Sequence, residues 1–150
     1  QNVENLDQGA GVPEEQVREL HGNATYARCL GCGLRIEMAD VKKDFFANGA
    51  VAPCKACGGI VKSATISFGQ AMPEEPMLRA ERESLACDLF IVLGSSLTVF
   101  PAAGFPVMAA QNGAKLVIVN QQATDMDHLA ELVLPAALGE TLGKVIDQLE

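Results

Sequence analysis

Four of the five cysteines fall into two Cys-x-x-Cys pairs, Cys29 with Cys32 and Cys54 with Cys57. Each pair presents two thiolates across one tight turn, and two such pairs form a closed tetrahedral zinc site with Zn–S bonds of ~2.3 Å. Four protein ligands leave no open coordination position, so the spacing predicts a structural and not a catalytic Zn²⁺ ion.

Two other interpretations of the cysteines stay open at this point. Disulfides or buried free thiols are one, and an iron–sulfur cluster is the other. A segment of about 35 residues is too small to bury a core of its own, which favours a metal in place of that core. Cys87 stands at the start of an apolar run, and we expect it in the core.

A second set of polar residues follows two apolar runs. Gly94, Ser95 and Ser96 come directly after residues 88–93, and Asn120 follows residues 115–119. Ligands of open α/β sheets bind outside the carboxyl ends of the strands, so these residues are candidates for a nucleotide site. The chain has no Gly-x-Gly-x-x-Gly motif, and taken alone Gly-Ser-Ser also fits an ordinary turn between a strand and a helix.

Periodicity and turn residues predict the elements that position these groups. After a loop over 1–12, we expect helices over 13–20, 40–47 (capped by Asp40), 73–86, 101–111 and 139–149, and strands over 24–30, 60–68, 88–93, 115–119 and 132–134. The run over 88–93 is typical of a parallel strand covered on both faces. The fold class predicted is α/β, part of a doubly wound Rossmann-like parallel sheet with an inserted zinc-ribbon module at 26–62, between segments 1–25 and 63–150.

Composition excludes several classes of function. Hydrophobic residues make up 49% and charged residues 20% of the 150 residues, which is typical of a globular protein. The net charge of −8 argues against nucleic acid as a direct partner. No apolar stretch is long enough to span a membrane, and no secretory signal is recognisable, so we expect a cytoplasmic, intracellular protein.

Several motifs in order resemble the sirtuins, the NAD-dependent protein deacylases. They are Gln1-Asn2, Glu19-Leu20-His21-Gly22, the two cysteine pairs, Ile66 to Gln70, Gly94 to Ala102, and Val119-Asn120. The match follows the order and spacing of the catalytic domain over its C-terminal three-fifths. The resemblance implies transfer of an acyl group from a lysine side chain to ADP-ribose with release of nicotinamide, with NAD⁺ as co-substrate and Zn²⁺ as structural ion.

The resemblance also implies residue roles. His21 resembles the catalytic histidine, a general base on the nicotinamide ribose, and Asn2 the asparagine that positions that ribose and water. The cofactor-binding set implied is Gln1, Asn2, Glu4, Gly94, Ser95, Ser96 and Asn120. The acyl-lysine peptide is expected to add as a strand between two segments, through Ile66, Phe68, Gly69, Gln70, Leu97 and Val99.

The chain also departs from the family pattern. Glu4 stands where the family usually has aspartate, and the Gly-Ala-Gly turn and central strands of the front of the domain have no counterpart here. We therefore expect these 150 residues alone to bind NAD poorly and not to turn over. A non-catalytic zinc-stapled module that binds peptide or ADP-ribose, and a mono-ADP-ribosyltransferase, are the alternative functions.

Overall fold

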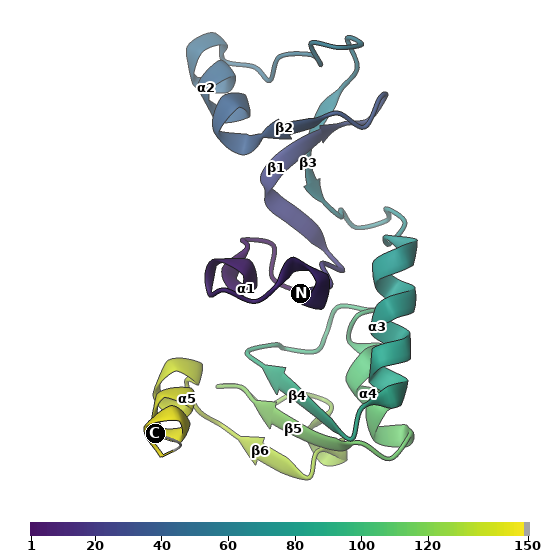
Figure 1. The fold of residues 1–150 in the computed structure, drawn as a ribbon, viewed down its shortest axis with the longest axis vertical. Coiled ribbons are helices and arrows are strands. Elements are labelled where there is room, and N and C mark those ends of the chain that lie inside the picture. The colour runs from purple at the N-terminus through teal and green to yellow at the C-terminus, as the bar shows by residue number, and fades with distance from the viewer. Residues whose placement is uncertain (149–150) are drawn as a thin grey trace. The chain divides into compact units, whose positions relative to one another are not determined.

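The computed structural model describes residues 1–148 (Figure 1). The chain divides into two compact units, Gln1–Pro76 and Met77–Glu150, and helix α3 (Glu74–Ala86) contains the boundary. The finer division into segments 1–25, 26–62 and 63–150 remains a prediction.

The first unit is built on a small antiparallel sheet with the order β2-β1-β3. Strand β1 pairs with both neighbours, and a register irregularity separates its start at Gly22 from Ala27. At its far end Cys29 lies opposite Val61 of β3, and at its start Gly22 lies opposite Thr65. The elements are α1 (Leu6–Gly9), η1 (Glu14–Gln16), β1 (Gly22–Cys29), β2 (Arg35–Glu37), α2 (Met38–Asn48) and β3 (Val61–Thr65).

Several expectations for this unit were wrong. The helix predicted over 13–20 is a single 3₁₀ turn, because the backbone is already extended at Val17 on the way to the strand. The loop predicted over 1–12 contains α1, strand β2 was missed, and β3 ends at Thr65. Helix α2 begins at Met38 with no side-chain cap, so Asp40 lies within its first turn and does not cap it.

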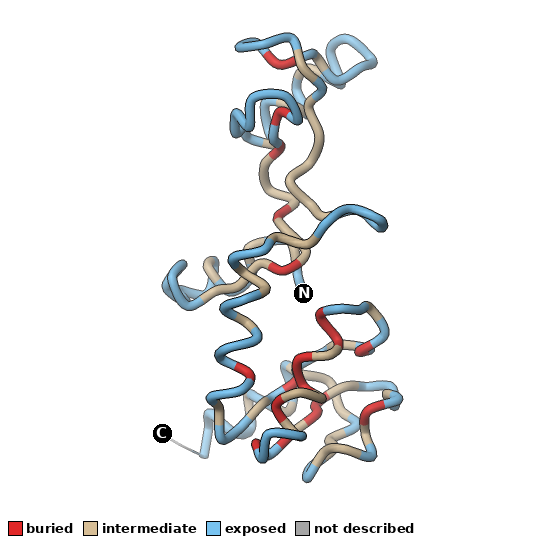
Figure 2. The backbone as a smooth tube through the Cα atoms, turned by 90° about the vertical axis from the view of Figure 1, so that its right-hand side faces the viewer, coloured by how far each residue is buried: buried red, intermediate tan, exposed pale blue. Residues whose placement is uncertain are grey.

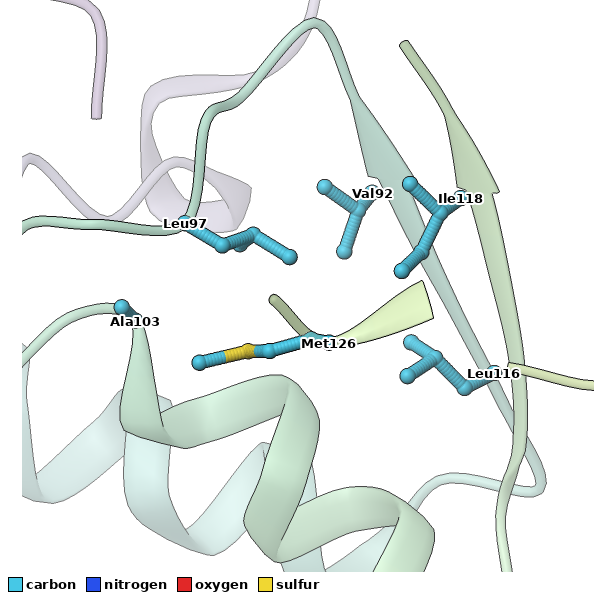
Figure 3. Close-up of a cluster of buried hydrophobic side chains, with 6 residues drawn as sticks. All are labelled: Val92, Leu97, Ala103, Leu116, Ile118 and Met126. Carbon is cyan, nitrogen blue, oxygen red and sulfur yellow. The ribbon is translucent and has the colours of Figure 1, made fainter. Parts of the chain in front are cut away.

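The second unit is a parallel sheet with the order β4-β5-β6, which confirms the α/β fold class. Helix α4 packs against β4 and β5. Figure 3 shows the apolar core on this face, formed by Val92, Leu97, Ala103, Leu116, Ile118 and Met126. The elements that follow α3 are β4 (Leu89–Leu93), α4 (Gly104–Gln111), β5 (Lys115–Val119), η2 (Asp127–Leu129), β6 (Leu132–Leu134) and α5 (Leu138–Asp147).

Strand β4 is covered on one face only, contrary to the expectation from its sequence. Val92 is buried in the core, whereas Leu89, Ile91 and Leu93 on the alternate face are about half exposed. Helix α4 packs against β4 and β5, and its Val107 and Ala110 contact the core that holds Val92, so the face with Val92 is the buried one. The apolar residues Leu142, Val145 and Ile146 of α5 are likewise part-exposed, and Leu149, the last residue of the helix predicted over 139–149, lies outside the described residues.

The two units differ in how they bury residues. In Figure 2 the second unit has more buried residues, some of them in consecutive pairs such as 102–103 and 118–119. The first unit has isolated buried positions, namely Leu20, Asn23, Ala27, Cys29 and Cys54. The small apolar interior of the first unit leaves room for another source of stability. Within residues 1–148, no helix has the length and apolar character that crossing a bilayer requires.

Candidate functional site

The four paired cysteines form one cluster at the end of β1. Their sulfur atoms all lie within 4.8 Å of one another, with Cys29 to Cys57 at 3.4 Å and Cys32 to Cys54 at 3.7 Å. A tetrahedral Zn²⁺ ion with Zn–S bonds of ~2.3 Å separates its sulfur ligands by about 3.8 Å. The sulfurs around a cluster of several irons lie farther apart, because they must surround the whole cluster. The donor set therefore fits a single structural zinc ion.

Two equivalent turns hold the cysteines. The Gly33 amide donates to the carbonyl of Cys29 at 2.9 Å, and the Gly58 amide donates to that of Cys54 at 2.8 Å. The Gly31 amide also donates to the Cys29 sulfur at 3.3 Å. Because the turns use backbone groups, the residues between the cysteines are free to vary in chemistry. The structure thus brings together all four predicted ligands.

The sulfurs also influence each other's protonation. Backbone amides of Cys32 and Gly31 lower the pKa of Cys29 to about 6, against the opposing effect of burial. The Gly59 amide lowers the pKa of Cys57, but the three other cysteine sulfurs and burial together raise it to about 12. Four thiolates at these distances repel one another, and a divalent cation at their centre removes that repulsion.

His21 lies at the opposite end of β1, directly before the strand begins. Its carbonyl accepts a hydrogen bond from the Ile66 amide at 2.9 Å, which continues the pairing of β1 with β3 by one residue. Its Nδ1 atom lies 3.4 Å from the carbonyl oxygen of Gln1. Its Nε2 atom is buried and has no hydrogen-bond partner among the described residues. A carbonyl only accepts, so the proton is assigned to Nδ1, and Nε2 carries the lone pair.

Gly22 permits the close approach of the two strands beside His21. Its φ is +70°, and a Cβ atom at this position would lie 2.1 Å from the carbonyl oxygen of Ala64. Both the backbone conformation and the space therefore require glycine. The candidate base His21 is therefore followed directly by the glycine at which β1 and β3 approach closely, and this approach fixes the position of the His21 backbone.

A group of polar side chains that the sequence reasoning missed joins the N-terminal segment to the start of β1. Its members are Asn5, Gln8, Glu19, Asn23 and Thr25, and Asn23 is only 3% exposed. The alternation along β1 held a signal for it, because the positions in step with buried Ala27 and Cys29 begin with polar Asn23 and Thr25. The predicted NAD contacts Asn2 and Glu4 in the same segment are exposed.

The predicted cofactor residues of the second unit lie at the carboxyl ends of β4 and β5. The Gly94 amide donates to the carbonyl of Val119 at 2.9 Å, which joins the two strand ends. The Ser95 hydroxyl accepts from the Leu97 amide at 3.3 Å, and the Ser96 hydroxyl lies 2.9 Å from that of Thr98. The Asn120 side-chain amide donates to the carbonyl of Gln122 at 2.8 Å. The structure therefore gathers Gly94–Ser96 and Asn120 at one edge of the parallel sheet.

Neither segment predicted to bind peptide forms a strand. Residues 66–70 continue from β3 as a turn, with Phe68 96% exposed and Gly69 at a φ of +80°. In the second unit Leu97 has a φ of +56° and its side chain is buried in the core, so only its backbone is available to a ligand. The Val99 carbonyl accepts a hydrogen bond from the Ala103 amide, directly before α4 begins.

Comparison with known proteins assigns the chain to a protein family. The family model of the Sir2 family matches residues 1–101. The chain belongs to the Sir2 family. This confirms the resemblance to the sirtuins that the motifs indicated.

Curated relatives extend the match along the chain. The chain is 53% identical over 146 residues to an NAD-dependent protein deacetylase of Rhodopseudomonas palustris, covering 97% of this chain and 58% of that protein. It is 55% identical over 146 residues to NAD-dependent protein deacetylase 1 of Bradyrhizobium diazoefficiens, covering 97% of this chain and 57% of that protein. The chain therefore spans less than two thirds of the curated relatives it matches.

Solved structures agree with the family. A Sir2 structure with a p53 peptide and NAD⁺ matches with a TM-score of 0.92 and 34% identity, over 99% of this chain and 60% of that one. Sir2Tm bound to a propionylated peptide matches with the same score and identity, over 99% of this chain and 61% of that one. The Rossmann-like sirtuin fold is thereby confirmed.

Replacing one zinc ligand is expected to unfold the antiparallel sheet of the first unit, which consists of β1, β2 and β3. Cys54→Ser removes a thiolate, so bound zinc should fall from about one ion per chain to a small fraction of that. Hydrogen exchange should then show lost amide protection in β1, β2 and β3. The control is Cys87→Ser, because the Cys87 thiol donates to the Ser84 carbonyl and lies outside the cluster. Metal analysis that finds iron, or unchanged zinc in Cys54→Ser, would contradict the assignment.

A methyl group at Gly22 is expected to separate β1 from β3. Gly22→Ala meets a backbone oxygen at 2.1 Å, whereas Gly49→Ala has a φ of +71° and no atom within 4 Å. Gly49→Ala should therefore cost only the left-handed strain of about 1–2 kcal/mol. Gly22→Ala should cost about 2 kcal/mol more in the free energy of unfolding, measured with denaturant. Equal losses in the two variants would show that the close approach is absent.

Proposed function

We propose that the protein containing this chain is an NAD-dependent protein-lysine deacetylase. The curated relatives carry that activity in their names, and related structures contain NAD⁺ and acylated or p53 peptides. One geometric observation carries the proposal, namely a histidine whose Nδ1 faces a backbone carbonyl while its Nε2 is buried without a hydrogen-bond partner among residues 1–148. This is the arrangement that a general base needs, with one nitrogen oriented and the other left to accept a proton.

In this proposal His21 takes a proton from a hydroxyl of the nicotinamide ribose through Nε2. NAD⁺ supplies the ADP-ribose that receives the acyl group, and nicotinamide is released. Asn2 is proposed to orient that ribose and the attacking water, with Gln1 and Glu4 beside it.

The second unit is proposed to hold another part of NAD⁺. Gly94 has a φ of +62° and forms the turn after β4, where backbone groups are available to a ligand. Ser95 and Ser96 provide hydroxyls in the same turn, and Asn120 provides a side-chain amide at the end of β5. Small residues and hydroxyls at strand ends suit phosphate and ribose oxygens. The zinc cluster has four protein ligands, so its role is to hold the first unit together.

The acyl-lysine substrate is proposed to bind by backbone pairing. Residues 66–70 and 97–99 lie outside the strands, and an extended peptide that pairs with either segment would draw it into a sheet. Such pairing places little demand on the peptide sequence. We further propose that the protein works in the cytoplasm, where thiols stay reduced, and that its charge of −8 disfavours direct contact with nucleic acid or anionic membranes.

Replacing the proposed base is expected to abolish turnover and preserve the fold. His21→Ala in the full-length protein should lower kcat for NAD-dependent deacetylation of an acetyl-lysine peptide by about 10²–10⁴-fold. His128→Ala is the matched control, because His128 is exposed in η2. Zinc content and circular dichroism should be unchanged in both variants. Undiminished deacetylation by His21→Ala would assign the chemistry elsewhere. Nicotinamide release with transfer of ADP-ribose to protein would instead indicate a mono-ADP-ribosyltransferase. If the full-length protein consumed no NAD, a non-catalytic binding module would be indicated.

The 150-residue chain by itself is expected to bind NAD weakly and to be inactive. It spans 58% of the length of the Rhodopseudomonas palustris relative. In addition, the apolar side chains of Leu89, Ile91 and Leu93 on one face of β4 are about half exposed, and β4 is an outer strand of the described sheet. Isothermal titration with NAD⁺ and an acetyl-lysine peptide assay, each run beside the full-length protein, measure the two properties. Turnover by the chain alone at a rate comparable to that of the full-length protein would contradict this expectation.

A further inference from the structure

Asn23 uses every hydrogen-bonding group of its side chain. Its amide nitrogen donates to Glu19 Oε1 at 2.6 Å and to Asn5 Oδ1. Its oxygen accepts from the Thr25 amide at 2.8 Å and from the Thr25 hydroxyl at 2.6 Å, and that hydroxyl accepts in turn from Asn5 Nδ2. An amide side chain has two donors and two lone pairs, so Asn23 is fully satisfied at 3% exposure.

These bonds attach the first residues of the chain to β1. The Ala24 amide donates to the Val3 carbonyl at 2.7 Å, and Gln8 donates to the same Glu19 oxygen at 2.9 Å. Asn5 has a φ of +58°, a left-handed conformation in which asparagine is tolerated better than most residues. The segment is therefore held by a backbone bond to Ala24 and by the side chains of Glu19 and of two β1 residues, Asn23 and Thr25.

The attached segment supplies the hydrogen-bond acceptor for the proposed base. The Gln1 carbonyl lies 3.4 Å from His21 Nδ1, two residues before the backbone bond at Val3. The acceptor on one ring nitrogen determines which nitrogen carries the proton in the neutral ring. A segment that moved by one ångström would lose this bond, because its length is already near the limit for a hydrogen bond.

We propose that Asn23, Glu19 and Asn5 are positioning residues that hold the Gln1 carbonyl against His21 and thereby fix the Nδ1–H tautomer. None of them is assigned a contact with the reacting atoms. The tautomer follows from the first unit alone, whereas its effect on turnover rests on the proposed function. The network thus extends the candidate site beyond the histidine to a buried support that places the proton of the neutral ring on Nδ1 and leaves the Nε2 lone pair available.

The test compares the histidine ring in variants of the full-length protein. Asn5→Gly removes the side chain and keeps the left-handed backbone, and Asn23→Ala removes the central amide. Nitrogen chemical shifts of ¹⁵N-labelled histidine distinguish the two tautomers without any need for activity. The wild type should show the Nδ1–H form at His21, and both variants should show a mixture. Asn5→Gly decides the matter if Asn23→Ala does not fold.

Kinetics provide the second measurement. Asn5→Gly and Glu19→Ala should lower kcat for deacetylation by about ten- to a hundredfold and change the KM for NAD⁺ much less. Glu19→Gln should keep most of kcat, because its side-chain oxygen still accepts from both amides. Ser84→Ala is the control, since Ser84 is nearly as buried as Asn23 but its hydroxyl donates to the Ala80 carbonyl of its own helix.

A single wild-type tautomer in Asn5→Gly with unchanged kcat would overturn the network. A kcat loss in Ser84→Ala equal to that in Asn5→Gly would also overturn it, because general destabilisation would then explain the effect. A wild-type protein that deacetylates no acyl-lysine peptide would contradict the proposed function instead. The tautomer comparison would still decide whether the network positions His21.

Discussion

The pairing of β1 with β3 is the interaction on which the first unit depends. One strand of eight residues has the candidate base before its first residue and a zinc ligand at its last, so the strand spans about 26 Å between the two sites. Opposite it, β3 presents Val61 to Cys29 and Thr65 to Gly22. A shift of register by one residue would displace both ends together. Gly22, which has no space for a Cβ, lies at the crossing beside His21 and allows the two strands to approach there.

The two units are stabilised by different means. The second has an apolar core in which Leu116 and Ile118 are almost completely buried, and its parallel strands pair in full register. The first buries few apolar side chains and relies on four thiolates at one end of β1 and a polar network at the other. Hydrogen bonds and metal ligation are directional, whereas apolar burial is not. A proton acceptor benefits from directional support, because its function depends on the orientation of one ring.

The sequence allowed prediction where a signal was local. The run Lys115–Val119 gave β5 with its observed bounds, and the cysteine spacing gave the complete ligand cluster. Prediction failed where tertiary contacts decide. The helix predicted over 13–20 does not form, because the backbone becomes extended at Val17 and Glu19 then hydrogen-bonds to Asn23. Strand β2 was missed because three residues are too few to show an alternation of apolar and polar positions. The Asn23 network joins residues 18 positions apart, and no spacing rule describes it.

The network and the zinc cluster are linked through β1 but act on different quantities. Loss of zinc removes ligation energy and so affects whether the sheet forms. Loss of the Asn5 side chain leaves the backbone conformation accessible to glycine and so affects where the Gln1 carbonyl lies within a folded unit. The Gln1 carbonyl oxygen lies 3.4 Å from His21 Nδ1 and orients the proposed base. Small displacements of this carbonyl would break the hydrogen bond while changing the free energy of unfolding little. Stability and activity should therefore respond to different residues of the same strand.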